Sequence, residues 1–307
     1  MRRLGGLALF LLLPSGIGGQ PLVGQANELP TRVSRRLVPP ASVPFGPGEI
    51  LEYKVKLGPF GVGSGQMSVI SLDSVRGHLT YHASLAISGG VPLFGVDDEF
   101  QSWFDVRSLA SRRFIQDVDE GSYERYRHYE IFPEERRFER RDKIGGGDIP
   151  SSLPLDDVSF LYFVRALPLN VGDEYSFDRY FREGGNPVVI KVLRKDTVNV
   201  PAGTFETVVV QPIIQTKGLF SQGGEAELHF SDDPRRLLVY LRSKVPLVGS
   251  ITLHLRGITE GTPLRSPGVG SGEELQPLLL PPGSTRVPPG STGGEPGSNP
   301  TVPDRGP

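Results

Sequence analysis

Apolar and polar residues alternate with a period of two along most of the chain, from about residue 49 to residue 260. In ILEYKVKL, residues 50–57, every second residue from Leu51 onward is apolar, and charged side chains stand between them. This period is typical of a β-strand with one face toward a core and the other toward water. Similar alternation recurs at residues 65–72, 79–87, 98–105, 225–230 and 250–257.

Short segments rich in turn-forming residues separate the predicted strands. They include Arg76-Gly77, Ser88-Gly89-Gly90 and Asp232-Asp233-Pro234, which we interpret as turns. Strands joined by short turns pair antiparallel, because parallel neighbours need crossovers of about a dozen residues or more. We therefore expect a mainly β domain with one curled antiparallel sheet, a half-open barrel or a sandwich, of about 10–13 strands.

The segment DDVSFLYFVRAL, residues 156–167, breaks the alternation and is apolar almost all round at helical spacing. Asp156 or Asp157 supplies an N-terminal start signal, and Pro168 ends the helix. A helix this apolar needs cover on all its sides. The sequence therefore predicts one α-helix over 156–167, packed into the curled sheet or across its mouth.

The N-terminus has the three zones of a secretory signal peptide. Arg2 and Arg3 precede an apolar run that is too short to span the roughly 30 Å of a bilayer core, and small residues follow up to Ala26. We expect cleavage near Ala26, with an uncleaved signal anchor as the alternative. The mature chain would then lie in the periplasm or cell envelope with no transmembrane span. Because the sequence has no Cys, it has neither a lipid-anchored Cys nor disulfides.

The rest of the chain divides by composition. Residues 27–48 form a predicted linker, 49–260 the β-rich domain and 261–307 a disordered Pro/Gly-rich tail, in which PPGST occurs at 281–285 and 288–292. The formal net charge of −2 gives no overall positive field to attract nucleic acid. The sequence does not define an oligomeric state.

Several segments together resemble a bacterial family known as domain of unknown function 3108, over about residues 45–260. They are GEILEYKVKLGPFGVGSGQMSV, DEFQSWFDVRSLASRRF, DDVSFLYFVRALPLNVGDEYSF, VNVPAGTFETVVVQP and AELHFSDDPRRLLVYLRSKVPLVGSITLHLRG. The resemblance implies an exported, β-rich envelope protein. It implies no activity, no cofactor and no catalytic residue.

The sequence lacks a G-x-S-x-G nucleophile elbow, a Cys nucleophile, a phosphate-binding P-loop and an H-E-x-x-H metal helix, so we assign no catalytic residue and no cofactor. Weak metal or acid/base candidates are Glu227, His229 and His254, which would converge if their strands are close neighbours. The acidic cluster at 97–99 is a second candidate. We favour the simpler interpretation for both groups: polar residues on a solvated sheet face for the first, and a loop-to-strand boundary exposed to water for the second.

Trp103 lies on the nominally polar side of its strand, which indicates that this side is not fully exposed to solvent. We hypothesise that Trp103, Phe160, Tyr162 and Phe163 line a groove for an apolar ligand, with core packing as the alternative. The sequence thus favours a non-enzymatic envelope protein that binds a lipid, a lipid-linked glycan or an envelope protein, or that acts as a scaffold. The alternative is an envelope hydrolase or glycan-modifying enzyme that uses the acidic and His candidates.

Overall fold

The computed structural model describes residues 42–92, 94–179, 181, 188–214, 226–245 and 249–264. All of them belong to one compact unit, residues 1–268. The predicted signal peptide, most of the predicted linker and the tail from residue 265 lie outside the described residues.

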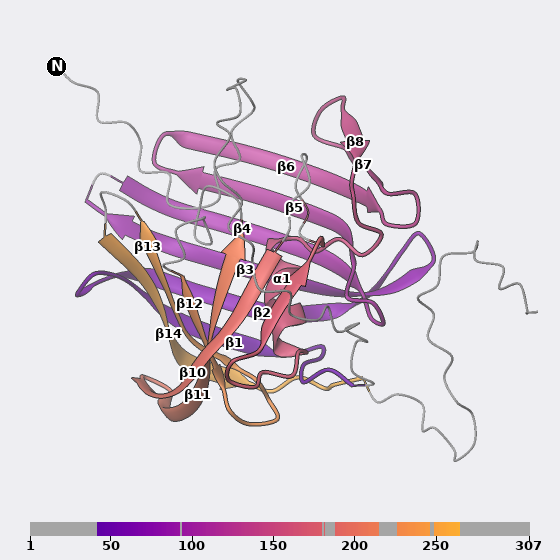
Figure 1. Cartoon of the computed structure of the whole chain (residues 1–307). Helices are drawn as coiled ribbons and strands as arrows, with labels where there is room; N and C mark the ends of the chain where they lie inside the picture. Colours follow the sequence, from indigo (N-terminus) through magenta and orange to yellow (C-terminus); the bar gives the residue numbers. More distant parts are fainter. Residues whose placement is uncertain are drawn as a thin grey trace, which may run out of the picture. The chain divides into compact units, whose positions relative to one another are not determined.

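The described residues form one antiparallel sheet of fourteen strands (Figure 1). The strands are β1 (Ile50–Leu57), β2 (Phe60–Val75), β3 (His78–Val91), β4 (Phe94–Asp105), β5 (Ser111–Glu120), β6 (Tyr123–Phe132), β7 (Arg137–Arg140), β8 (Gly146–Asp148), β9 (Glu174–Phe177), β10 (Val188–Val200), β11 (Gly203–Ile214), β12 (Glu227–Ser231), β13 (Leu238–Val245) and β14 (Gly249–Thr259). The mainly β prediction is confirmed. The strand number exceeds the expected range because β7, β8 and β9 have four residues or fewer.

Strands adjacent in sequence are also adjacent in the sheet, apart from β8 and β9. The first strand, β1, pairs with the last, β14, while β8 and β9 form the two outer edges. The sheet is curled, and its two edges are not joined, so the barrel is half-open, as expected (Figure 1). The connection between these edge strands contains the helix α1 (Asp157–Arg165), which packs against β3 and β4 inside the curve.

The helix begins where the sequence predicts. Asp156 is its N-cap and accepts hydrogen bonds from the backbone N–H groups of Val158 and Ser159, while the Ser159 hydroxyl accepts from the Asp156 N–H. The Ser102 hydroxyl of β4 donates to the same carboxylate at 2.5 Å. All nine helical residues are buried, which confirms the predicted buried helix, although α1 ends at Arg165 rather than at residue 167.

An ion pair holds the other end of α1. The Arg165 guanidinium donates to both carboxylate oxygens of Glu49, at 2.5 and 2.8 Å, and to the backbone carbonyls of Arg235 and Arg236. The Arg165 side chain is 0% exposed. Glu49 directly precedes β1, and the two carbonyls belong to the β12–β13 connection. Arg165 therefore joins the helix to both halves of the sheet.

Two buried tyrosines near this ion pair are expected to affect the free energy of unfolding differently when each is replaced with phenylalanine. The Tyr53 hydroxyl donates to the Leu238 carbonyl at 2.9 Å, whereas the Tyr162 hydroxyl has no hydrogen-bond partner in the described part of the chain. We expect Tyr53→Phe to lower the free energy of unfolding by about 1 kcal/mol, and Tyr162→Phe to leave it unchanged or raise it by about as much. Urea unfolding of both variants checks this. An equal loss of free energy of unfolding in both variants would contradict the difference in hydrogen bonding between the two hydroxyls.

Candidate functional site

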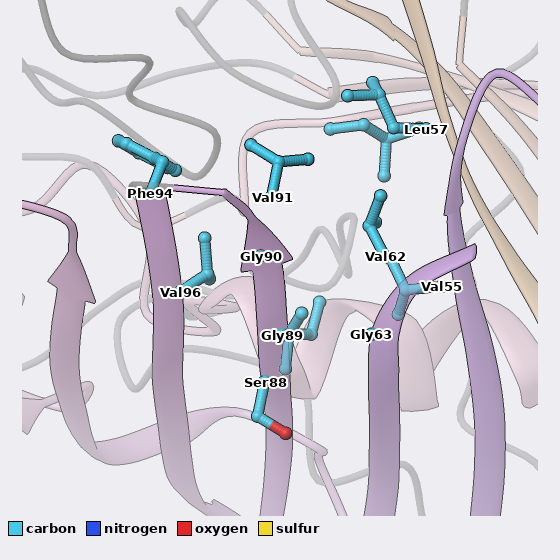
Figure 2. A pocket seen from close by; sticks show the side chains of 12 residues that line it. Val55, Leu57, Val62, Gly63, Ser88, Gly89, Gly90, Val91, Phe94 and Val96 are labelled. Atoms are coloured by element: carbon cyan, nitrogen blue, oxygen red, sulfur yellow. The ribbon is translucent and has the colours of Figure 1, made fainter. Parts of the chain in front are cut away.

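A pocket opens at one end of the sheet, where the β1–β2 and β3–β4 hairpins turn and β14 begins (Figure 2). It is an open depression with about 460 Å³ of empty space, a volume that includes open solvent. Its lining residues are Val55, Leu57, Val62, Gly63, Ile87, Ser88, Gly89, Gly90, Val91, Phe94, Val96 and Ile251. Ser88 supplies the one polar side chain among them, and none of these residues belongs to α1. The pocket therefore suits an apolar group.

Two glycines create the floor of the pocket. Gly63 of β2 and Gly89 of β3 are register partners, flanked in the same row by Val55 and Val96. A Cβ on Gly63 would lie 2.2 Å from the Ser88 carbonyl oxygen, and a Cβ on Gly89 would lie equally close to the Val62 carbonyl oxygen. Gly89 also has φ +150°, a conformation open essentially to glycine alone. The row therefore has no side chains at its centre, because the neighbouring backbone occupies the positions that a Cβ would take.

This geometry corrects one sequence-based interpretation. Ser88-Gly89-Gly90 was expected to be a turn, but all three residues lie inside β3, and the chain reverses only after Val91. Glycine serves here to let β2, β3 and β4 approach closely rather than to form a turn.

A pair of buried acids adjoins the pocket. Asp98 is the register partner of the lining residue Ile87, and Glu120 is the partner of the lining residue Val96. Both acids are almost completely buried. Desolvation, together with the nearby Glu120 carboxyl, raises the pKa of Asp98 to about 7. The acidic cluster predicted at 97–99 is thus divided between two faces, because Asp97 and Glu99 are exposed on the other side of β4.

The raised pKa of Asp98 predicts how stability depends on pH. The folded protein keeps a proton that the unfolded chain releases near the ordinary pKa of 3.8, so the stabilising effect is complete below about pH 4 and is lost as pH rises through about 7. We expect Asp98→Asn to raise the free energy of unfolding by about 2 kcal/mol at pH 8 and to change little at pH 4. Urea unfolding across this range, with the exposed Asp97→Asn as control, measures it. A gain in the free energy of unfolding that is the same at every pH would contradict the raised pKa of Asp98.

The four aromatic residues predicted to line a groove do not lie together. The Trp103 indole N–H donates to Asp73 at 2.8 Å, and its ring stacks on His82 at 4.0 Å between centroids, on the face opposite α1. The other three, Phe160, Tyr162 and Phe163, are buried on the helix. None of the four lines the pocket in Figure 2. A ligand groove built from them stays a prediction, and the pocket is a different site.

The weak metal candidates are also separated. His229 of β12 and His254 of β14 lie on either side of Tyr240 of β13, whose ring is 5.0 Å from each imidazole. Glu227 receives two hydrogen bonds from Arg194, at 3.0 and 3.3 Å, and its carboxylate lies 3.7 Å from His229 Nε2. Burial lowers the pKa of both histidines. Within the described ranges no three His, Cys, Asp or Glu residues are arranged to hold a metal ion.

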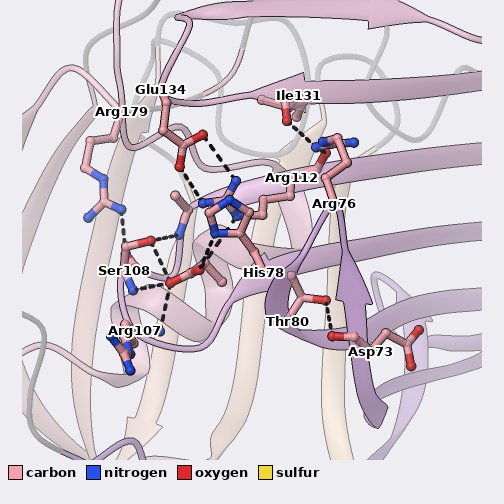
Figure 3. Close-up of polar contacts among 12 residues, drawn as sticks. Asp73, Arg76, His78, Thr80, Arg107, Ser108, Arg112, Ile131, Glu134 and Arg179 are labelled. Atoms are coloured by element: carbon pink, nitrogen blue, oxygen red, sulfur yellow. Dashed lines mark hydrogen bonds and ion pairs between the residues drawn. The ribbon is translucent and has the colours of Figure 1, made fainter.

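A polar cluster lies at the opposite end of β3, β4 and β5 from the pocket (Figure 3). Arg112 donates to the Glu134 carboxylate at 2.6 Å and lies 3.6 Å from Asp105, which caps the loop that follows β4 by accepting from the Ser108 N–H. Arg179 donates to the Ser108 carbonyl at 3.0 Å, and burial lowers its pKa to about 9. These contacts join the β4–β5 loop to neighbouring segments, so we interpret the cluster as structural.

Comparisons with known proteins add a family and a set of similar folds. A model of the family described as "Protein of unknown function (DUF3108)" matches residues 52–256. No curated protein matches the sequence. In the described residues, no helix has the length and apolar character needed to span a membrane.

Three solved structures are similar to this chain at low identity. A β-barrel-like DUF1849 protein from Brucella abortus has 8% identity and a TM-score of 0.47, over 70% of this chain and 98% of that one. A protein provisionally described as a lipoprotein, from Parabacteroides distasonis, has 11% identity and a TM-score of 0.32, over 71% and 99%. A protein provisionally described as exported, with a YmcC-like fold, from Bacteroides fragilis, also has 11% identity and a TM-score of 0.32, over 71% of this chain and 99% of that one.

Proposed function

The chain belongs to the DUF3108 family. On that premise we propose that it is an exported, non-enzymatic binding protein. It holds an apolar chain, such as a lipid acyl chain, in the pocket where the β1–β2 and β3–β4 hairpins turn. The single observation that supports this most directly is the pocket itself. Its lining is apolar apart from Ser88, so the enclosed part of a ligand must be apolar too.

The chemistry of the lining favours a hydrocarbon chain as the ligand. Each methylene group that leaves water for such a lining contributes about 0.8 kcal/mol. An acyl chain gains affinity along its length in this way and needs no polar partner inside the pocket.

Binding of N-phenyl-1-naphthylamine, an uncharged fluorophore that brightens in apolar surroundings, tests the proposal. Val62 lines the pocket and is only half-buried, so a larger side chain there fills the space without disturbing the core. We expect the wild-type protein to bind the fluorophore and Val62→Trp to bind it at least ~10-fold more weakly, since several apolar contacts are lost.

The matched control places the same side chain elsewhere on the same strand. Ile70 of β2 is 49% exposed and does not line the pocket, so Ile70→Trp is expected to bind the fluorophore like the wild type. If the wild type does not bind, or if both variants bind equally well, the pocket does not hold apolar chains.

Export is the second part of the proposal, and it is supported by the charged, apolar and small-residue zones of residues 1–26. Intact mass measurement of the protein from a bacterial envelope fraction is expected to show a chain that begins near residue 27. Replacing Leu11 and Leu12 with arginine should interrupt the apolar run and leave a full-length chain in the cytoplasm. A full-length wild-type chain in the cytoplasm would contradict export.

A further inference from the structure

Two hairpins expose apolar side chains at the mouth of the pocket. Phe60, at the start of β2, is 72% exposed, and Val91, at the end of β3, is 41% exposed. Figure 2 shows Val91 and Phe94 at the tip of one hairpin, beside Leu57 and Val62 of the other. The sequence has no ionisable residue from 57 to 64 or from 87 to 96. The pocket rim, defined as Phe60, Val62, Val91 and Phe94, is therefore apolar and uncharged.

Two lysines lie directly behind one side of the rim. Lys54 and Lys56 belong to β1, and the Lys54 ammonium reaches to 3.7 Å from the Cβ position of Gly61, next to Phe60. Neither lysine forms an ion pair with a described carboxylate. The other side of the mouth carries the exposed acids Asp97 and Asp119. The mouth thus has one basic flank and one acidic flank behind an uncharged rim.

We propose that the pocket rim docks on the surface of a phospholipid bilayer, with Phe60 and Val91 among the lipid chains and with Lys54 and Lys56 at the lipid phosphates. This inference rests on the proposed function, because the bilayer is then the source of the bound chain. The basic flank approaches the phosphates first, since like charge repels the acidic flank.

A bilayer fits this surface better than a protein partner does. A stable protein interface buries about 800 Å² on each partner and uses charged and hydrogen-bonding groups to fix its register. Four apolar side chains on two hairpins offer neither that area nor those groups. Apolar side chains enter the acyl boundary of a bilayer without shape complementarity, and cationic side chains behind them add attraction to anionic lipids.

Flotation with vesicles of phosphatidylcholine and phosphatidylglycerol tests the inference. We expect the wild-type protein to float with the vesicles, and Phe60→Ser/Val91→Ser to partition at least ~10-fold more weakly, because both inserted side chains are lost. The matched control is Ile70→Ser/Leu79→Ser, since each of these residues is 49% exposed and lies away from the mouth. It should float like the wild type. Lys54→Gln/Lys56→Gln should lose the part of the binding that depends on phosphatidylglycerol.

The outcomes separate this inference from the proposed function. Wild-type protein that binds N-phenyl-1-naphthylamine but does not float with phosphatidylcholine vesicles, either with or without phosphatidylglycerol, would overturn the docking inference alone. So would a control variant that loses as much as the rim variant, or a dimer in sedimentation that dissociates when Phe60 and Val91 are replaced. Wild-type protein that floats but does not bind the fluorophore would overturn the proposed function instead.

Discussion

Replacing Glu49 with alanine is expected to lower the free energy of unfolding by about 3–5 kcal/mol. The change leaves the Arg165 guanidinium, which is 0% exposed, without a carboxylate partner. Two backbone carbonyls, those of Arg235 and Arg236, remain as acceptors, and they do not balance a buried charge. Urea unfolding of the variant and the wild type measures the difference.

The control for this prediction is an ion pair on the surface. Glu52 accepts from Arg256 at 3.3 Å, and both side chains are nearly half exposed, so Glu52→Ala should cost less than about 1 kcal/mol. Replacing Glu49 with leucine and Arg165 with methionine together should recover most of the loss, because no buried charge remains. Equal losses at Glu49 and Glu52 would show that the buried pair does not hold α1.

Replacing Gly89 with alanine is expected to destabilise the protein by on the order of 3 kcal/mol and to weaken binding in the pocket. The backbone has φ +150° at this position, and the new Cβ would lie 2.2 Å from the Val62 carbonyl oxygen. Relief of that contact moves β2 and β3 apart at the floor of the pocket. Thermal unfolding and N-phenyl-1-naphthylamine binding of the same variant report the two effects.

Gly95 provides the matched control for Gly89. It lies in β4 near the same end of the sheet, its φ is not positive, and a Cβ there would meet nothing within 4 Å. Gly95→Ala should therefore unfold and bind the fluorophore like the wild type. A Gly89→Ala variant as stable as Gly95→Ala would mean that the close approach of β2 and β3 is not required.

The alternation of apolar and polar residues was sufficient to predict the kind of sheet, and the break at 156–167 was sufficient to predict the buried helix. Both are local patterns whose periods report which side of an element faces the core. Even Trp103 lies on the side that alternation assigned to it, opposite Phe104. Trp103 stacks on His82, whereas Phe160, Tyr162 and Phe163 lie on the helix, and a groove lined by all four stays a prediction.

The pocket and the buried ion pair could not be predicted because both depend on contacts between distant residues. Glu49 and Arg165 are 116 residues apart, and neither has a local signal that identifies its partner. The glycines at 63 and 89 were visible in the sequence, but glycine between strands usually marks a turn. Their role in the floor of the pocket follows only from the register of β2 on β3.

The two ends of the sheet differ in a way that suits a binding protein. At one end the polar cluster around Arg112 and Asp105 ties the β4–β5 loop to neighbouring segments. At the other end an apolar pocket lies between two hairpins whose tips, residues 57–64 and 87–96, carry no ionisable residue. The Arg165–Glu49 pair holds the helix between the halves of the sheet. The polar cluster and the buried ion pair therefore hold the sheet that carries the apolar pocket.

Methyl NMR of the protein during titration with a dodecyl-chain ligand tests the central claim most directly. If the pocket holds the chain, the methyl signals of Val55, Val62, Val96 and Ile251 shift with a common affinity, while those of Val158 and Val164 on α1 stay in place. Shifts confined to the helix, or no shifts at saturating ligand, would contradict the claim that this pocket is the binding site.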